Sequence, residues 1–289
     1  MKKITKEMIS ELRKISFQGI MDCKLALQDA DGDINRAVEI LQEKGLMSFI
    51  QRNDKETSEG NVFVAVNEHS SSTIMGSLCC ETDFVTKNEI FQKAVADIIT
   101  CLTKTDPKNL TNILEISSLL KASHDGVSIA DIVAAVFSKI KEKIIIGDFA
   151  IYPAISDMVT AHYVHFNKKV GAMVQLKVKE NIDISDKRVI SIANDIALHI
   201  TAMNPMGYDE DDLSLDLIET ERKIFAEQIK DKPEQIKENI INGKMHKFYS
   251  RHCLKYQSFV KDPSITIQDL INSEPGIKNI HQFDRLSIG

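Results

Sequence analysis

The chain changes its hydrophobic period across one nine-residue stretch, Cys80-Glu81-Thr82-Asp83-Phe84-Val85-Thr86-Lys87-Asn88. The apolar run over residues 73–80 indicates a strand. The residues that follow the stretch have helical spacing, with one apolar stripe made of Ile90, Phe91, Ala94, Val95, Ile98 and Ile99. The stretch therefore joins a strand to a helix, and loops carried by rigid elements often hold functional residues.

The junction places a carboxylate, Asp83, beside a large apolar ring, Phe84. One interpretation is structural: Thr82 or Asp83 caps the helix by accepting a backbone N–H, and Phe84 packs inward as a hydrophobic staple. The other interpretation is a turn that presents both side chains to a partner. The residues alone favour the structural interpretation, because helix caps of this kind are common.

Composition places the chain among soluble globular proteins. Its 289 residues are enough for two domains and a sizeable core. A net charge of −6 without concentrated basic residues argues against nucleic acid as a direct partner. No apolar run approaches the roughly 18 residues that a membrane span needs, and the basic start Met1–Glu7 has no apolar block behind it. We expect a cytoplasmic protein without membrane contact.

The sequence offers no catalytic or metal-binding pattern. Its five cysteines lack CxxC spacing, and adjacent Cys79 and Cys80 point to opposite faces of a strand. GxSxG, Walker A, HExxH and GxGxxG motifs are absent. We interpret the acidic run Asp209–Asp212 as a solvated loop with a helix N-terminus, where acids are favoured. The expectation is no enzyme, no metal and no cofactor, so any effect on a nucleotide must act through another protein.

The hydrophobic pattern predicts an α+β chain of three parts and a linker. Residues 1–50 are predicted to form three short helices, each with a single apolar face, so the three must pack together. Residues 51–60 are predicted to be a polar linker. Two strand–turn–strand–helix units follow in 61–150 and 151–289, which suggests an internal duplication. Their predicted strands and helices cover 61–66, 74–80 and 88–102, then 159–165, 170–178 and 187–203. Residues 104–147 are expected to be helical, with a loop near His124.

The sequence pattern of residues 215–250 predicts an antiparallel helical hairpin within the second unit. Apolar residues recur among many charges on both arms, and Asp231-Lys232-Pro233 reverses the chain between them. Because the apolar seams are narrow, the pair either projects from the body or folds onto the core as ordinary surface helices. The residues alone leave both arrangements open.

Four segments resemble signatures of the elongation factor Ts family, in the family's order. They are Gly19–Leu27 with Gly32-Asp33-Ile34 and Ala37-Val38; Cys80–Val85; Tyr163-Val164-His165 with Lys169-Val170-Gly171; and Gly243–Tyr249 with Phe259–Ser264. The resemblance covers nearly the whole chain. It implies a ubiquitin-associated-like three-helix domain at the start and favours a projecting hairpin.

The resemblance also implies a function: guanine-nucleotide exchange on elongation factor Tu, without covalent chemistry. The chain would bind elongation factor Tu in its GDP-bound and nucleotide-free forms and promote GDP release by disturbing the Mg²⁺ and phosphate site, so that GTP can bind. In the family this Mg²⁺ dislocation is associated with the four residues that match Thr82, Asp83, Phe84 and Val85. Other partner-binding positions match Arg13, Ile20, Met21, Lys24, Ile140, His165 and Val260.

Three of these partner-binding positions have a plainer alternative, and the chain departs from the family in places. Lys24 would be an exposed helix charge, Met21 a core residue and His165 a structural histidine. Lys141 replaces a usual glycine, which reaches conformations that lysine avoids, and Phe17 is bulky where small residues are typical. The competing function is a ubiquitin-associated-type adaptor that binds a helical partner without nucleotide exchange. Self-association through the core sheets also remains open.

Overall fold

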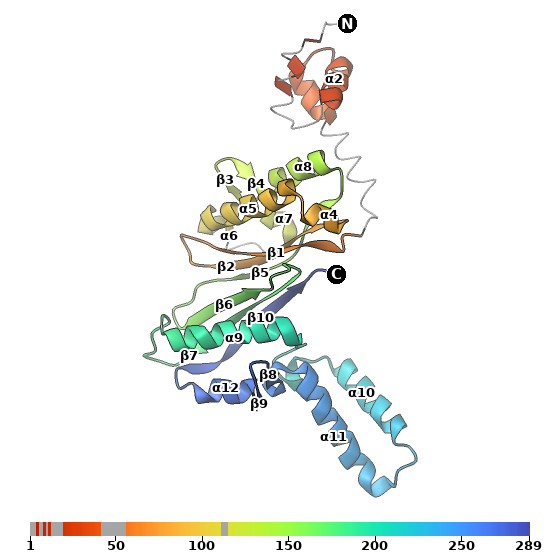
Figure 1. The fold of residues 1–289 in the computed structure, drawn as a ribbon, viewed down its shortest axis with the longest axis vertical. Helices are drawn as coiled ribbons and strands as arrows, with labels where there is room; N and C mark the ends of the chain where they lie inside the picture. Colours follow the sequence, from red (N-terminus) through yellow and green to blue (C-terminus); the bar gives the residue numbers. More distant parts are fainter. Residues whose placement is uncertain (1–3, 6–7, 10, 13–19, 42–55, 111–114) are drawn as a thin grey trace. The chain divides into compact units, whose positions relative to one another are not determined.

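The computed structural model describes residues 4–5, 8–9, 11–12, 20–41, 56–110 and 115–289. Contacts within the chain divide it into two compact units, Met1–Ile151 with Leu286–Gly289, and Tyr152–Arg285. Both units combine helices with β-sheet (Figure 1), which makes the chain α+β as predicted.

The first unit contains a three-stranded sheet of order β1-β2-β5. Strands β1, Glu59–Val66, and β2, Thr73–Cys80, pair antiparallel from Glu59↔Cys80 to Val66↔Thr73. Because β1 begins at Glu59, the last two residues of the predicted linker belong to the sheet. The third strand, β5, Ile144–Tyr152, was not predicted.

Helices cover one side of this sheet (Figure 1). The helix α5, Glu89–Lys104, buries Phe91, Ala94, Val95 and Ile98 of the predicted stripe, while Ile99 is partly buried and Ile90 is exposed. The helix α8, Ile129–Ile140, joins the same apolar core. The connection between them was expected to be helical. It holds short helices α6, Pro107–Leu110, and α7, Ile116–Leu119, and a small hairpin of β3, Ser123–His124, with β4, Val127–Ser128. The predicted loop near His124 is confirmed as the turn of this hairpin. The helical expectation was wrong for the two short strands beside the turn and for the start of β5, whose β-branched isoleucines favour a strand.

The N-terminal segment contributes its own small cluster. Helix α2, Ile20–Asp29, and a helix over residues 34–41 contribute buried residues to a cluster with Leu12. The buried members are Leu12, Cys23, Ala26, Leu27, Ala37 and Leu41. Residues 13–19 and 42–55 lie outside the described residues, so the complete three-helix domain and the linker remain predictions.

The second unit is built on the sheet β10-β7-β6. Strands β6, Met158–Val164, and β7, Val170–Val178, form the predicted antiparallel pair, and helix α9, Lys187–Met203, has the predicted bounds. Strand β10, Ile277–Ser287, was not predicted. The remaining elements are the 3-10 helix η2, Leu254–Tyr256, β8, Ser258–Phe259, β9, Asp262–Thr266, and α12, Ile267–Ser273.

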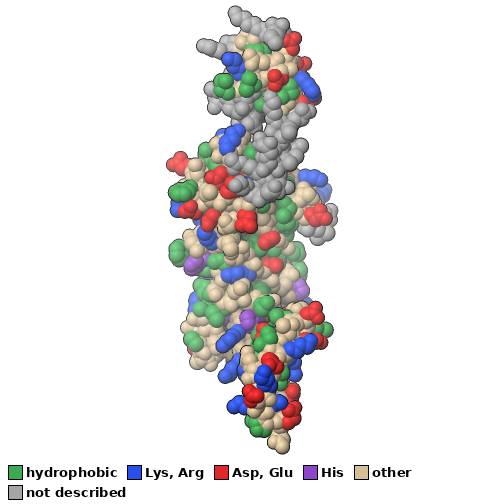
Figure 2. Space-filling view, turned by 90° about the vertical axis from the view of Figure 1, so that its right-hand side faces the viewer, with side chains coloured by type: hydrophobic (Ala, Val, Ile, Leu, Met, Phe, Trp, Pro, Cys, Tyr) green, Lys and Arg blue, Asp and Glu red, His purple; other side chains and the backbone are tan. Residues whose placement is uncertain are grey.

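The predicted helical hairpin is present in the second unit (Figure 1). Its arms are α10, Leu215–Gln228, and α11, Glu234–His252, joined through the predicted turn. Within the described chain α10 buries no residue, while Met245 and Phe248 of α11 are buried in a cluster near the base. Charged side chains of both signs mingle over the hairpin, at the lower end of Figure 2. No described helix combines the length and the apolar character that crossing a membrane requires.

Candidate functional site

The stretch between β2 and α5 folds into one short helical turn, α4, Asp83–Thr86. Thr82 precedes α4 with an extended backbone, φ −128° and ψ 153°, and its side chain makes no capping bond. Asn88 instead caps α5, because its side-chain oxygen accepts a 2.8 Å hydrogen bond from the N–H of Ile90. The interpretation of Thr82 or Asp83 as the helix cap was therefore wrong.

Phe84 and Val85, adjacent in sequence, point in opposite directions. Phe84 is 79% exposed, whereas Val85 is 5% exposed and belongs to the core beneath α5. Phe84 is thus not a staple, and Val85 takes the inward place. The turn presents a large aromatic ring to solvent and holds it there through the neighbouring buried valine.

Side-chain bonds tie this turn to the connection between α8 and β5. The Thr82 hydroxyl donates to the Glu142 carboxylate, with both oxygens 3.1 Å from Oγ1. The backbone N–H of Lys143 donates to Oε1 of Glu81 at 2.7 Å. These contacts join segments about 60 positions apart. They restrict the motion of the turn from outside, so Phe84 does not depend on local bonds alone for its position.

The connection that holds the turn has an unusual backbone. Lys141 ends α8 in the left-handed region at φ 65°, and its N–H donates to the carbonyl of Phe137 at 2.8 Å. A side chain costs roughly 1 kcal/mol in this conformation. The lysine therefore keeps the glycine-like backbone that the family position suggests, and Glu142 follows it directly.

Asp83 lies at the start of α4 in an exposed ion pair. Its Oδ2 is 2.8 Å from Nζ of Lys87, and both side chains are about half exposed or more. The hydrogen bond from Lys87 to Asp83 raises the pKa of the lysine. Because exposed pairs of this kind are weak, the carboxylate can exchange Lys87 for a donor on a partner. The carbonyl of Asp83 accepts from the Thr86 hydroxyl at 2.7 Å, which closes the helical turn.

The thiol at the end of β2 supports the same turn. Cys80 is fully buried and its Sγ donates to the carbonyl of Thr82 at 3.3 Å. Burial, followed by the nearby Glu142 carboxylate, raises the pKa of Cys80 to about 12. The thiol is therefore protonated at neutral pH and serves as a donor rather than a nucleophile.

The N-terminal contact positions predicted from the resemblance are partly described. Met21 is 63% exposed and Lys24 is exposed, so the core-filling alternative for Met21 was wrong. Both lie on α2. Arg13 and the side chain of Ile20 lie outside the described residues.

Two further predicted positions lie in different units. Ile140, at the end of α8, is partly buried against the core of the first unit. Val260 follows β8 and is 39% exposed, and its N–H donates to Nδ1 of His199 at 3.2 Å. His199 is fully buried, and burial lowers its pKa, so it acts as a neutral acceptor that fixes the Val260 turn.

The turn between β6 and β7 brings three aromatic residues together. The ring of His165 lies 4.4 Å from that of Phe166, and Nδ1 of His165 is 3.3 Å from the Tyr163 hydroxyl. His165 is half-buried, whereas Phe166 is 86% exposed. Sequence reasoning singled out His165 and missed Phe166. The available signal was a large apolar residue directly before the Asn167-Lys168 turn, where a side chain faces solvent.

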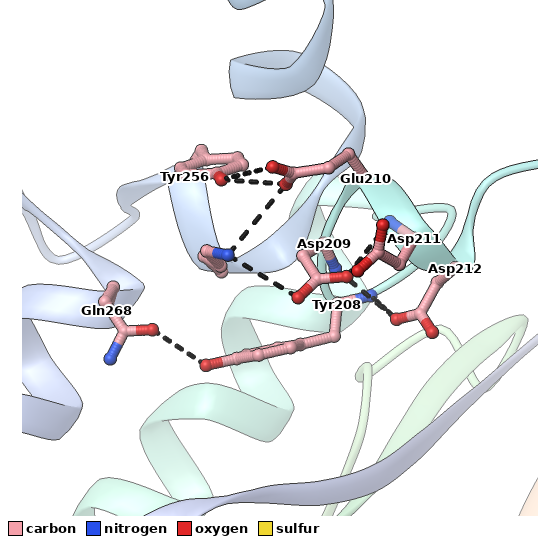
Figure 3. Close-up of polar contacts among 8 residues, drawn as sticks. Tyr208, Asp209, Glu210, Asp211, Asp212, Tyr256 and Gln268 are labelled. Carbon is pink, nitrogen blue, oxygen red and sulfur yellow. Dashed lines mark hydrogen bonds and ion pairs between the residues drawn. The ribbon is translucent and has the colours of Figure 1, made fainter. Parts of the chain in front are cut away.

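The acidic run Asp209–Asp212 is a structural connection and not a site (Figure 3). Residues Glu210–Asp212 form a 3-10 turn, η1, which Asp209 caps by accepting from the N–H of Asp211 at 3.1 Å. The Tyr256 hydroxyl donates to Glu210 at 2.7 Å, and Nζ of Lys255 is 3.5 Å from Asp209. The carboxylates of Asp209 and Glu210 therefore already have partners.

The same connection joins the base of the hairpin to α12. The N–H of Tyr208 donates to Asp212 at 2.7 Å, and its hydroxyl donates to Gln268 at 2.8 Å (Figure 3). A hydrogen bond from the backbone of Glu210 and one from Tyr256 lower the pKa of Glu210.

Among the described residues, no group of three or more His, Cys, Asp or Glu side chains could hold a metal ion.

Comparison with known proteins decides the family. The model of the family described as Elongation factor TS matches residues 81–289. A protein described as elongation factor Ts from Amoebophilus asiaticus (strain 5a2) is 31% identical over 288 residues, which cover 99% of each chain. The chain belongs to the elongation factor Ts family.

Other elongation factor Ts proteins match over most of their length. The protein from Halothermothrix orenii (strain H 168 / OCM 544 / DSM 9562) is 34% identical over 97% of this chain and 91% of its own length. That from Clostridioides difficile (strain 630) is 32% identical over 94% of this chain and 86% of its own length. Membership of the elongation factor Ts family places the chain in translation elongation and protein biosynthesis.

Proposed function

We propose that this chain binds elongation factor Tu–GDP and promotes release of GDP, so that GTP can replace it. The observation that carries the proposal is the exposed ring of Phe84, on a turn held by Val85, Glu81 and Glu142. A pre-organised aromatic side chain can enter a partner with little loss of conformational entropy. Family membership supports the choice of elongation factor Tu as that partner.

The proposed mechanism acts on the partner's Mg²⁺ site without covalent chemistry. Burial of the Phe84 ring between partner elements is worth roughly 2–3 kcal/mol, which offsets the disorder that insertion creates. Mg²⁺ requires near-octahedral oxygen ligands, so a small displacement of those ligands weakens its binding and that of GDP. Asp83 would leave Lys87 and accept a hydrogen bond from the partner, which holds the displaced state.

Binding of GDP and binding of this chain to elongation factor Tu are thermodynamically linked. If this chain weakens GDP binding by some factor, GDP weakens binding of the chain by the same factor. The ternary complex is therefore transient, and incoming GTP displaces the exchange factor. The final nucleotide equilibrium does not change, because the chain leaves unaltered.

We propose secondary contacts at the remaining matched positions. Met21 and Lys24 are exposed on α2 and would grip the partner's nucleotide domain; Arg13 and Ile20 would do so by resemblance alone. His165, Ile140 and Val260 would contact it elsewhere. We infer that Val85 acts through packing, since its own side chain is buried. The proposed location is the cytoplasm, and self-association through the sheets remains a prediction.

Release of a fluorescent GDP analogue from elongation factor Tu tests the proposal. The chain should accelerate release, and Phe84→Ala should remove most of the acceleration, about thirtyfold if the lost burial is worth about 2 kcal/mol. Leu215→Ala is the matched control, because Leu215 is a 77% exposed apolar residue outside the turn. An adaptor would bind elongation factor Tu and leave release unchanged. Equal acceleration by the parent and Phe84→Ala would remove the turn from the mechanism.

A further inference from the structure

The helical hairpin carries a pocket that the exchange proposal does not use. It is a cavity of about 330 Å³ between α10 and α11, at the small end of ligand pockets. Phe225 of α10 and Phe248 of α11 supply its apolar lining. Phe248 is buried and Phe225 is partly buried, so both rings are fixed elements of the wall.

Basic side chains dominate the charge around these rings. Lys244, Lys247 and Arg251 line the pocket from α11, at spacings of three and four residues that place them on one helix face. One carboxylate, Glu221 of α10, lies among them, so three positive charges face one negative charge. The His252 ring adds another nitrogen-bearing group, with its centroid 4.6 Å from that of Phe248.

The basic groups differ in how they are held. Nζ of Lys244 lies over the Phe225 ring, 5.2 Å from its centroid, and also donates to Gln228. Lys247 and Arg251 are exposed, and no described carboxylate forms an ion pair with either side chain. A guanidinium can bind a carboxylate through two parallel hydrogen bonds. The pocket therefore combines a fixed apolar wall with cations available for an anionic ligand.

We propose that this pocket binds a short acidic peptide segment of a partner protein, with an apolar side chain against Phe225 and Phe248 and carboxylates on Lys247 and Arg251. Charge complementarity supports this occupant, because the pocket is locally basic on a chain of net charge −6. A nucleic acid fits less well, since a strand needs a longer basic groove to neutralise successive phosphates. The proposal does not depend on nucleotide exchange.

Fluorescence anisotropy with the full chain tests this binding. The probe is a fluorescein-labelled peptide in which pairs of glutamates flank one phenylalanine, measured at low ionic strength, where charge contacts are least screened. The double variant Lys247→Glu, Arg251→Glu should bind about tenfold more weakly. The matched control is Lys223→Glu, Lys232→Glu, which makes the same charge change on exposed hairpin residues outside the pocket lining, and should bind within about twofold of the parent.

Additional peptides and variants make each outcome of this experiment decisive. A peptide with glutamine in place of glutamate should bind at least about tenfold more weakly, and added salt should weaken binding of the acidic peptide. Arg251→Gln serves if the double variant loses helix content by circular dichroism, and should weaken binding about threefold. Undetectable peptide binding, equal binding by both double variants, or equal binding of the glutamine peptide would overturn the proposal. Displacement of the peptide by oligoadenylate would assign the pocket to nucleic acid instead.

Discussion

Two turns of this molecule expose a phenylalanine, and they do so by different means. Phe84 follows β2 and is 79% exposed, while Phe166 lies between β6 and β7 and is 86% exposed. Bonds from distant residues Glu142 and Lys143 hold the first turn. Local bonds hold the second, including the N–H of Lys169 to the side-chain oxygen of Asn167 at 3.0 Å.

The difference separates a rigid aromatic contact from an adaptable one. A side chain held from outside its own turn loses little entropy when it enters a partner, whereas a turn held by local bonds has fewer restraints and loses more. Phe84 therefore suits a step that requires fixed geometry, and Phe166 suits a contact that adds affinity.

The largest expected effect is on stability, at the residue beside Phe84. Val85→Ala removes two buried methyl groups and should lower the free energy of unfolding by about 2 kcal/mol. Phe84→Ala should leave it nearly unchanged, because the ring is mostly in water. Urea denaturation followed by circular dichroism measures both. Similar losses in the two variants would mean that the Phe84 ring contributes to the fold.

The next largest effect is expected on the rate of GDP release, through the hydrogen bond between Thr82 and Glu142 that holds the first turn. Glu142→Ala leaves the Thr82 hydroxyl without its acceptor and should slow GDP release about fivefold, a loss near 1 kcal/mol. Glu142→Gln keeps an acceptor oxygen and should retain most of the rate. Stopped-flow release at saturating exchange factor checks this pair. A positioning role predicts rescue by glutamine, whereas two equal variants would contradict it.

A smaller effect is expected at the second turn. Phe166→Ala should weaken binding to elongation factor Tu about threefold, as for a partly adaptable surface contact, and leave the release rate at saturation unchanged. Titration of release rate against concentration separates the two quantities. If Phe166→Ala lowers the saturating rate as Phe84→Ala does, the two turns have the same role and the contrast fails.

The smallest effect concerns the ion pair of Asp83. Lys87→Ala removes an exposed partner at 2.8 Å and should leave the melting temperature unchanged within error. GDP release should be equal to the parent's or slightly faster, because Asp83 no longer has to leave Lys87 before it meets the partner. A clear fall in the release rate would show that the ion pair itself shapes the active turn.

Local sequence patterns predicted the parts of the fold that local patterns specify. Strands β2 and β7 follow from apolar runs beside turn residues, and helix α9 follows from its helical stripe. The start of β5, residues 144–147, was expected to be helical because its isoleucine run has no period of its own, and the rest of the strand was not predicted. Strand β10 was missed because its buried residues, which include Ile277 and Ile280, do not alternate regularly.

The candidate site also depends on features that local sequence patterns do not specify. The motif pointed to Thr82–Val85, but neighbouring apolar residues in a turn do not reveal which one faces water. Glu142 gave no signal, since its bond to Thr82 spans 60 positions and depends on how β5 joins the sheet. Phe166 was visible in the sequence and was passed over in favour of His165.

The long-range support of the first turn has a consequence for inhibitor design. A linear peptide copied from residues 80–88 would carry the aromatic ring and the carboxylate but not Glu142 or the backbone N–H of Lys143. Such a peptide would sample many shapes in water and compete poorly with the parent protein. A useful mimic would have to be a cyclic molecule in which a covalent bridge replaces the contacts made by Glu142 and Lys143.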